Sequence, residues 1–315
     1  MSSIVNGIYI ENPLTKNAKG GTELMRDRFL SSINKDLLQG VAVHFSRVER
    51  IDTNLKQILY VHDLPGDGMY NEIMSDQYIQ YIDKFVFVSY HQRDLFIQYY
   101  RLPHSKCYVI HNAIDVGNKL YKKSDKKPET FNFIYHTTPH RGLEILYEVI
   151  DKLSKSYSVH LDVYSSFKIY GWGQRDNQYL NLFENIKKHE NMTYHGAVPN
   201  NEIIESLQKS HIFLFPSIWH ETSCLALIEA IQTDNIVIHS DLGALPETSR
   251  NMTHMFEMTE DCNELANRAY KTASHVLDNY EVARDKLNFK KQNYDFHYSL
   301  DRYAKEWNQL LESIF

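Results

Sequence analysis

Residues 211–247, HIFLFPSIWHETSCLALIEAIQTDNIVIHSDLGALPE, decide how the chain folds. The run HIFLFPS is short, apolar and rich in aromatic and branched side chains, which predicts a buried parallel strand. Thr222 and Ser223 are good N-cap residues, so we expect a helix from about Cys224 to Asp234, followed by a second strand, IVIHS. The turn between strand and helix should aim free backbone N–H groups outward, and such a helix N-terminus is an anion site.

Two glutamates with seven residues between them flank the start of this helix. Glu221 lies before it and Glu229 about two turns inside it. On a helical wheel Glu229 shares one sector with Gln232 and Thr233, while apolar residues fill the rest. On periodicity alone, therefore, Glu229 belongs either to a binding site or to a solvated stripe.

Length and composition describe a globular protein of about two domains. The chain has 315 residues, 43% of them hydrophobic and 23% charged, and its net charge of −6 argues against nucleic-acid binding. Three cysteines without a pairing pattern fit a reducing compartment and exclude a disulfide framework or a CxxC metal site. We find no signal peptide and no run approaching the ~18 apolar residues of a membrane span, so we expect a cytoplasmic protein.

Strands and helices alternate twice along the chain, which predicts two parallel sheets wrapped by helices. The first series begins with a strand at 4–12 and a helix at 22–33, and it ends with a strand at 107–115. The lysine-rich segment 119–129 is interpreted first as a solvated linker between the domains. The alternative is a weak peripheral contact with a membrane or an anionic polymer. The second series ends in a helical tail from Asp261 onward.

Three further turns stand at the ends of the predicted strands, where open α/β sheets place their ligands. Gly20 and Gly21 precede the first helix and allow a backbone to approach a ligand closely. His62 ends the strand ILYVH, although a lone histidine is usually a satisfied polar residue. Residues 137–143, TTPHRGL, place Arg141 at a strand-to-helix turn, where its planar guanidinium suits a diphosphate unless it is only surface charge.

Taken together, these features resemble the retaining glycosyltransferases of family 4. The E-x7-E pair is similar to the donor-site signature of that family, and residues 137–143 are similar to its S-x-P-x-R-G-L variant. The paired glycines and the strand-ending His62 fit the same pattern. The resemblance covers both halves of the chain and implies the α/β GT-B fold, with two Rossmann-like parallel domains facing a cleft. It places the acceptor domain at 1–117, the nucleotide-sugar domain at 118–296, and a helix at 297–315 that crosses back to brace the first domain.

The resemblance implies transfer of a sugar from a nucleotide diphosphate, UDP or GDP, to a glycan or lipid-linked acceptor, with retention of configuration, in polysaccharide biosynthesis. No Asp-x-Asp metal motif occurs in the sequence, so we expect no metal and no other cofactor, and stabilisation of the leaving nucleotide by cations and fixed dipoles. By resemblance, the catalytic residues are His62, Glu221 and Arg141. The donor-binding residues implied in the same way are Gly20, Gly21, Thr137, Thr138, Arg141, Thr222, Ser223, Cys224, Leu225 and Glu229.

The sequence departs from the family in two places. Members commonly carry an Arg and a Lys flanking the first turn and glycines after the first glutamate, whereas this chain has His136 and Thr137, and then 222–224, at those positions. A catalytically weakened GT-B module that binds nucleotide or glycan is therefore a second hypothesis. A dinucleotide oxidoreductase is a third, but residues 171–173, GWG, lack the third glycine of its fingerprint. The sequence leaves open the base, the sugar, the acceptor and the oligomeric state.

Overall fold

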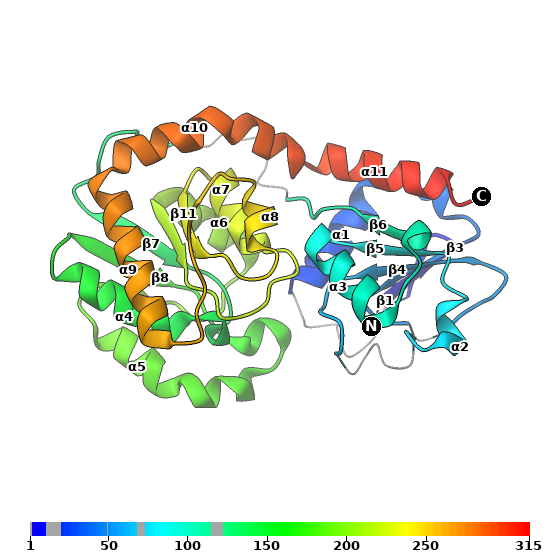
Figure 1. The fold of residues 1–315 in the computed structure, drawn as a ribbon, viewed down its shortest axis with the longest axis horizontal. Helices are drawn as coiled ribbons and strands as arrows, with labels where there is room; N and C mark the ends of the chain where they lie inside the picture. Colours follow the sequence, from blue (N-terminus) through cyan, green and yellow to red (C-terminus); the bar gives the residue numbers. More distant parts are fainter. Residues whose placement is uncertain (1, 11–19, 49, 68–72, 115–121) are drawn as a thin grey trace. The chain divides into compact units, whose positions relative to one another are not determined.

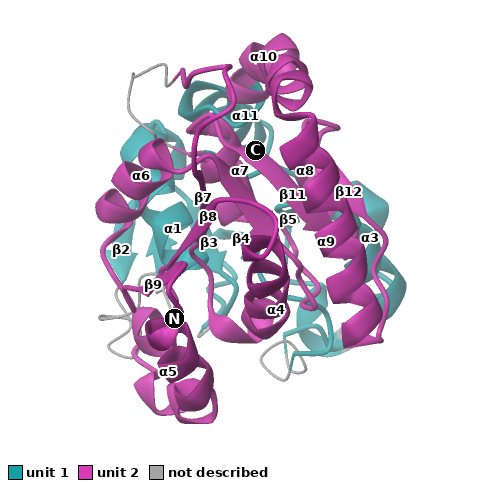
Figure 2. Cartoon of the chain, turned by 90° about the vertical axis from the view of Figure 1, so that its left-hand side faces the viewer, with its two compact units in different colours: residues 1–113, 297–315 teal, residues 114–296 magenta. Residues whose placement is uncertain are grey.

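The chain forms two compact α/β units (Figure 1; Figure 2). Unit 1 comprises Met1–Ala113 with His297–Phe315, and unit 2 comprises Ile114–Phe296. Within the residues that the computed structural model describes, each unit holds one six-stranded sheet. These residues are 2–10, 20–48, 50–67, 73–114 and 122–315.

The sheet of unit 1 has the strand order β2-β1-β3-β4-β5-β6. Neighbours from β3 to β6 are parallel, but β1 is antiparallel to both β2 and β3. The prediction of a single strand at 4–12 in an all-parallel sheet is therefore wrong at this edge. Asn6 and Gly7 have φ angles of 50° and 74°, and an Asn-Gly pair in this conformation closes a tight hairpin. The strands are β1 (Ser2–Val5), β2 (Ile8–Ile10), β3 (Val41–Phe45), β4 (Lys56–Val61), β5 (Lys84–Phe87) and β6 (Cys107–Val109).

The last helix of the chain, α11 (Leu300–Glu312), belongs to unit 1. Its buried Trp307 packs edge-on against Phe29 and Tyr60, with ring centroids 4.8 and 5.0 Å away. Arg302 Nη2 donates to the carbonyl oxygen of His111 at 2.7 Å. The chain's end thus completes the core of unit 1. The other helices of this unit are α1 (Gly21–Ser32), η2 (Lys35–Leu38), α2 (Asp76–Ile79), α3 (Tyr90–Tyr100) and η4 (His104–Lys106).

The sheet of unit 2 has the strand order β12-β11-β10-β7-β8-β9, and all its neighbouring pairs are parallel. The chain builds outward from β7 through β8 to β9, then returns to place β10 on the other side of β7. The strand order therefore reverses between β7 and β10, and ligands of open α/β sheets bind at such a point. The strands are β7 (Phe131–Tyr135), β8 (Val159–Val163), β9 (Met192–Tyr194), β10 (Ile212–Phe215), β11 (Ile236–Ser240) and β12 (His254–Phe256).

Helices cover both faces of this sheet (Figure 1). Helix α4 buries one apolar stripe, including Leu146 and Ile150, and α9 packs alongside it. Across the described residues, none of the helices is long and apolar enough to cross a membrane. The helices of unit 2 are η5 (Pro139–Arg141), α4 (Leu143–Ser154), η6 (Phe167–Tyr170), η7 (Gly173–Tyr179), α5 (Leu180–Lys188), α6 (Asn200–Lys209), α7 (Leu225–Gln232), α8 (Leu245–Ser249), α9 (Cys262–Asp278) and α10 (Tyr280–His297).

The lysine-rich segment is not a uniformly solvated linker. Lys123 Nζ donates to the carbonyl oxygens of Leu207 at 2.7 Å and Ser210 at 2.6 Å, and the Lys123 N–H donates to Asp234 Oδ2 at 2.6 Å. Burial lowers the pKa of Lys123 well below its ordinary value, against the attraction of Asp234. This lysine anchors the segment to unit 2, which corrects the expectation. Residues 119–121 of the segment lie outside the described part of the chain.

Candidate functional site

The turns that follow β7 and β10 are packed directly against each other at the switch point. Gly142 has a φ angle of 112°, and a Cβ at this position would lie 2.1 Å from the carbonyl oxygen of Pro216. Only glycine allows so close an approach in that conformation. Inside the first turn, the Tyr135 hydroxyl donates to the carbonyl oxygen of Thr138 at 3.0 Å. These contacts therefore fix the backbone position from which the Arg141 side chain extends.

The loop after β11 holds the loop after β10 in place. Ser240 Oγ donates to the carbonyl oxygen of Ser217 at 2.7 Å, and the Ala244 N–H donates to the carbonyl oxygen of Glu221 at 2.8 Å. Gly243 has a φ angle of 63°, and a Cβ there would lie 2.8 Å from the backbone of Glu221. The turns after β7, β10 and β11 thus hold the backbone of Glu221 in place.

Arg141 and Glu221 form an ion pair across the two packed turns. Arg141 Nη1 donates to Oε1 of Glu221 at 2.7 Å and to Oε2 at 2.9 Å, and the two side chains are 23% and 5% exposed. Burial raises the pKa of Glu221, while the guanidinium pulls it back down. Arg141 Nε is buried without a hydrogen-bond partner among the described residues. The guanidinium has five N–H groups, so it keeps donors for an anion while it holds Glu221.

Glu229 is buried inside unit 2, with 3% of its surface exposed. The solvated-stripe alternative is therefore wrong. Asn200 Nδ2, at the start of α6, donates to Glu229 Oε1 at 3.1 Å, and His136 Nε2 lies 3.6 Å from Glu229 Oε2. Glu229 thus faces α6 and the end of β7 instead of water. Neither neighbour could be recognised from the helix alone.

Helix α7 begins at Leu225 and its N-cap is the buried Cys224, with no side-chain capping bond. The prediction that Thr222 or Ser223 caps the helix is wrong; both are half-buried in the loop before it. Burial raises the pKa of the Cys224 thiol well above its ordinary value, so the thiol stays protonated. The positive end of the helix dipole therefore lies between the two glutamates without a charged cap of its own.

His62, in unit 1, directly follows β4. Its backbone N–H donates to Ser46 Oγ at 3.1 Å, and its ring lies 4.2 Å from the ring of Tyr60, measured between centroids. Burial lowers the pKa of His62 to about 3, against a hydrogen bond to the Tyr60 backbone that raises it. The imidazole is therefore neutral at physiological pH.

The two predicted glycines also belong to unit 1. Gly20 is the N-cap of α1, and its N–H donates to Glu23 Oε2 at 3.0 Å. Gly21 is the first residue of the helix. The Gly20 N–H is thus already bonded within the first turn of α1. The predicted site residues from Thr137 to Glu229 all lie in unit 2, whereas Gly20, Gly21 and His62 lie in unit 1.

The structure adds an aromatic group that the sequence did not single out. The His140 ring stacks on Phe167 at 5.1 Å and meets Trp219 edge-on at 4.8 Å. Burial, then the nearby Arg141, lowers the pKa of His140 to about 4, so this ring is neutral near pH 7. The Trp219 side chain, 45% exposed, leaves an apolar surface beside the Arg141 turn.

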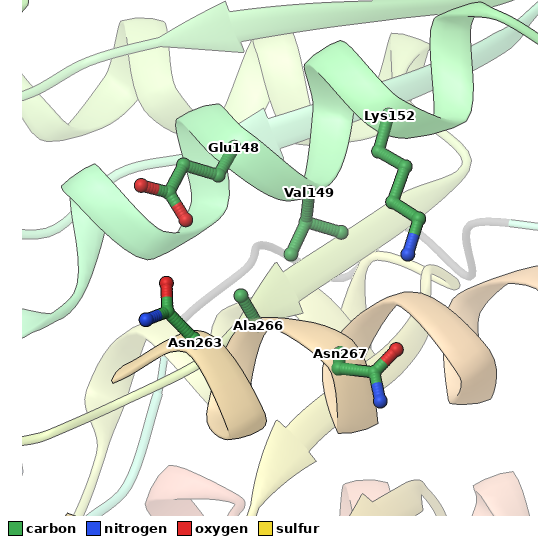
Figure 3. A pocket seen from close by; sticks show the side chains of 6 residues that line it. All are labelled: Glu148, Val149, Lys152, Asn263, Ala266 and Asn267. Atoms are coloured by element: carbon green, nitrogen blue, oxygen red, sulfur yellow. The ribbon is translucent and has the colours of Figure 1, made fainter. Parts of the chain in front are cut away.

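A separate groove lies between α4 and α9 and holds about 180 Å³ (Figure 3). Its lining is polar at both ends and includes none of the predicted site residues. The residues are Glu148, Val149, Lys152, Asn263, Ala266 and Asn267. The described residues contain no group of three or more His, Cys, Asp or Glu side chains arranged to hold a metal ion.

Residues 119–269 match the family model described as glycosyl transferases group 1. No curated protein has a significant match to the sequence. Among solved structures, the chain is similar to a glycosyltransferase from Rickettsia africae, with 18% identity and a TM-score of 0.66 over 97% of this chain and 84% of that one.

Two further structures are similar to this chain. One is the pneumococcal O-GlcNAc transferase GtfA in complex with UDP and GlcNAc, at 13% identity and a TM-score of 0.61, covering 83% of this chain and 53% of that one. The other is Anabaena HepE in complex with UDP and glucose, at 14% identity and a TM-score of 0.61, covering 82% of this chain and 72% of that one. The chain thus spans about half the length of the pneumococcal protein. Identities this low show the fold, and the predicted GT-B class is confirmed.

Proposed function

From the glycosyl transferases group 1 match at residues 119–269, we propose that the chain transfers a sugar from a nucleotide diphosphate donor, UDP or GDP, to a glycan or lipid-linked acceptor with retention of configuration. The observation that carries the proposal is the Arg141–Glu221 pair, which leaves guanidinium donors at the strand switch point beside α7. Two of the similar structures are named as complexes with UDP, which supports the choice of ligand. Retention follows from the resemblance to family 4.

In this proposal, unit 2 holds the nucleotide and stabilises its departure. The bond from the sugar's anomeric carbon to the phosphate oxygen breaks, and its electron pair leaves on the diphosphate. Arg141 and the N-terminus of α7 stabilise that growing negative charge. The acceptor oxygen bonds to the anomeric carbon from the same face and passes its proton to the departing phosphate. Glu229 accepts hydrogen bonds from the ribose hydroxyls, and Glu221 holds the donor sugar.

His62 is assigned to the sugar through its hydrogen-bonding capacity. Because burial keeps the imidazole neutral, it contributes no full positive charge to the reacting centre at pH 7. A neutral ring positions a hydroxyl by donating or accepting one hydrogen bond. The acceptor side is assigned to unit 1 by resemblance only.

A thermal-shift screen against UDP, GDP, ADP, CMP and NAD tests the proposal. A ligand at about 100 times its dissociation constant adds about 2.7 kcal/mol to the stability of the native state, so the correct nucleoside diphosphate gives a clear rise in melting temperature. We expect UDP or GDP to do so and NAD to have no effect. A chain that responds to none of the nucleotides contradicts the proposal. Release of free sugar or transfer to an acceptor then distinguishes an enzyme from a binding module.

We predict that donor turnover persists in excess EDTA. The sequence has no Asp-x-Asp metal motif, so in this proposal Arg141 and the helix dipole stabilise the negative charge of the leaving group. Turnover is measured as nucleotide release, with and without the chelator. Abolition by EDTA followed by rescue with manganese would contradict the metal-free mechanism.

A further inference from the structure

Two of the three tryptophans in the chain are exposed, and both belong to loops that contact the turn carrying Arg141. Trp307 is fully buried in the core of unit 1, whereas Trp172 and Trp219 are 48% and 45% exposed. Trp219 stands two residues before Glu221, on the loop after β10. A folded chain gains stability by burying rings this large, so exposed indoles beside a candidate site are informative.

Trp219 is held in place by its own loop and by the Arg141 turn. Its N–H donates to Ser217 Oγ at 3.2 Å, and Ser217 Oγ donates to the Trp219 carbonyl oxygen at 3.1 Å. The indole meets the His140 ring edge-on at 4.8 Å, and His140 stacks on Phe167 at 5.1 Å. A ring that is fixed before binding loses little conformational freedom when a ligand arrives.

The loop that carries Trp172 is locked by a buried carboxylate. Asp176, which is 6% exposed, accepts from Ser166 Oγ at 2.5 Å and from the Phe167 N–H at 2.8 Å. The Trp172 N–H donates to the carbonyl oxygen of Phe167 at 3.1 Å. Both exposed tryptophans are therefore tied to the His140–Phe167 stack.

The chemistry of this surface suits a sugar. One face of a pyranose ring carries C–H groups that pack on an aromatic ring, while its hydroxyls need hydrogen-bond partners at the edge. Arg175 is exposed, and its guanidinium carbon lies 4.5 Å from the centroid of the Trp172 ring. It thus offers N–H donors to hydroxyls beside an aromatic face. Aromatic faces with a few polar groups at their edge are typical of small-ligand sites.

The position of the two indoles favours the acceptor over the donor. Glu221 and Glu229, which the proposed function assigns to the donor, are 4% and 3% exposed, whereas both indoles lie at the surface. A nucleotide donor carries one sugar, but two exposed rings on separate loops suit several sugar rings.

We propose that Trp219, with Trp172 joined to it through the His140–Phe167 stack, forms a binding platform for sugar rings of the acceptor, which makes the acceptor a glycan. This inference rests on the proposed function and narrows its acceptor class. Resemblance assigns the acceptor side to unit 1, and the platform adds a contact from unit 2.

Saturation-transfer NMR tests the platform with the methyl glycosides of glucose, galactose, mannose and N-acetylglucosamine. The protein is first saturated with UDP or GDP, whichever raises the melting temperature. We expect the parent to bind at least one glycoside, and Trp219→Ala to weaken that binding by about tenfold. Trp219→Phe keeps an aromatic ring and should restore most of it. Calorimetric affinity for the nucleotide should stay as in the parent in both variants.

Phe289→Ala is the matched control, because this ring is 86% exposed but lies on α10 and in neither loop. It should bind glycoside and nucleotide as the parent does. Equal glycoside binding by the parent and Trp219→Ala, or none by a parent that binds the nucleotide, would overturn the inference while the proposed function stands. A parent that binds neither UDP nor GDP would overturn the proposed function itself.

Two further outcomes separate the acceptor from the donor. A tenfold loss of nucleotide affinity in Trp219→Ala would assign the indole to the nucleobase and overturn the inference. UDP-glucose and GDP-mannose then replace the free nucleotide. An acceptor ring stays bound beside the donor's own sugar, whereas displacement of the glycoside would place it at the donor-sugar position and overturn the acceptor assignment.

Discussion

Arg141→Ala is expected to lower donor turnover by about 10²-fold or more. Removing one preorganised group that stabilises developing charge typically costs that much. The guanidinium is anchored through Nη1 on Glu221, while its buried Nε has no partner among the described residues. The guanidinium is therefore fixed by Glu221 and still has N–H groups that can donate to an anion. Turnover is measured as nucleotide release under saturating donor.

This substitution also removes the partner of a buried carboxylate. Breaking a buried pair costs about 3–5 kcal/mol, and the partial exposure of Arg141 places the expected loss of stability toward the lower end. Assays are therefore run well below the melting temperature, with far-ultraviolet circular dichroism unchanged.

The matched control is Arg268→Ala on α9. This arginine pairs with Glu257 and Glu264 at the surface, so its loss should leave turnover as in the parent. If Arg141→Ala turns over as Arg268→Ala does, Arg141 is only a structural partner of Glu221 and the phosphate assignment fails.

Local sequence patterns predicted most of the fold, because buried parallel strands form compact apolar runs. The runs at β7 and β10 read as strands directly from the sequence, and the structure places them side by side. The error lies at 4–12, where the Asn6–Gly7 pair turns the chain back. The Asn-Gly dipeptide is a hairpin signal that the sequence contains, but the loose alternation of apolar and polar residues on both sides of it favoured a single strand.

The candidate site was predictable only in part, for a different reason. The motifs and the family resemblance singled out Arg141 and Glu221 as candidates, but no spacing predicts that these residues, separated by 80 positions, form an ion pair. The helical wheel could not reveal that Asn200 covers Glu229. Lys123 likewise looked solvated because its carbonyl partners lie about 85 residues away along the chain. Such contacts depend on tertiary packing, which local periodicity does not encode.

Glu229→Gln is expected to weaken nucleotide binding by about tenfold or more. A carboxylate that accepts ribose hydroxyls makes charge-assisted hydrogen bonds worth about 1.5–3 kcal/mol each, and 1.4 kcal/mol is a factor of ten in affinity. Melting without ligand should change little, because glutamine keeps the shape of glutamate and its carbonyl oxygen can still accept from Asn200. Glu264→Gln, on the surface of α9, is the control and should bind as the parent does.

The measurement that tests the central claim most directly is a double-mutant cycle between Glu229 and the ribose. Parent and Glu229→Gln are each titrated calorimetrically with the nucleoside diphosphate and with its 2′,3′-dideoxyribose analogue, which isolates the coupling between carboxylate and hydroxyls. We predict that the analogue binds both proteins about equally and that the coupling energy is about 1.4 kcal/mol or more. A coupling energy near zero would show that Glu229 does not contact the ribose, and it would contradict the assignment of this site to a nucleotide donor.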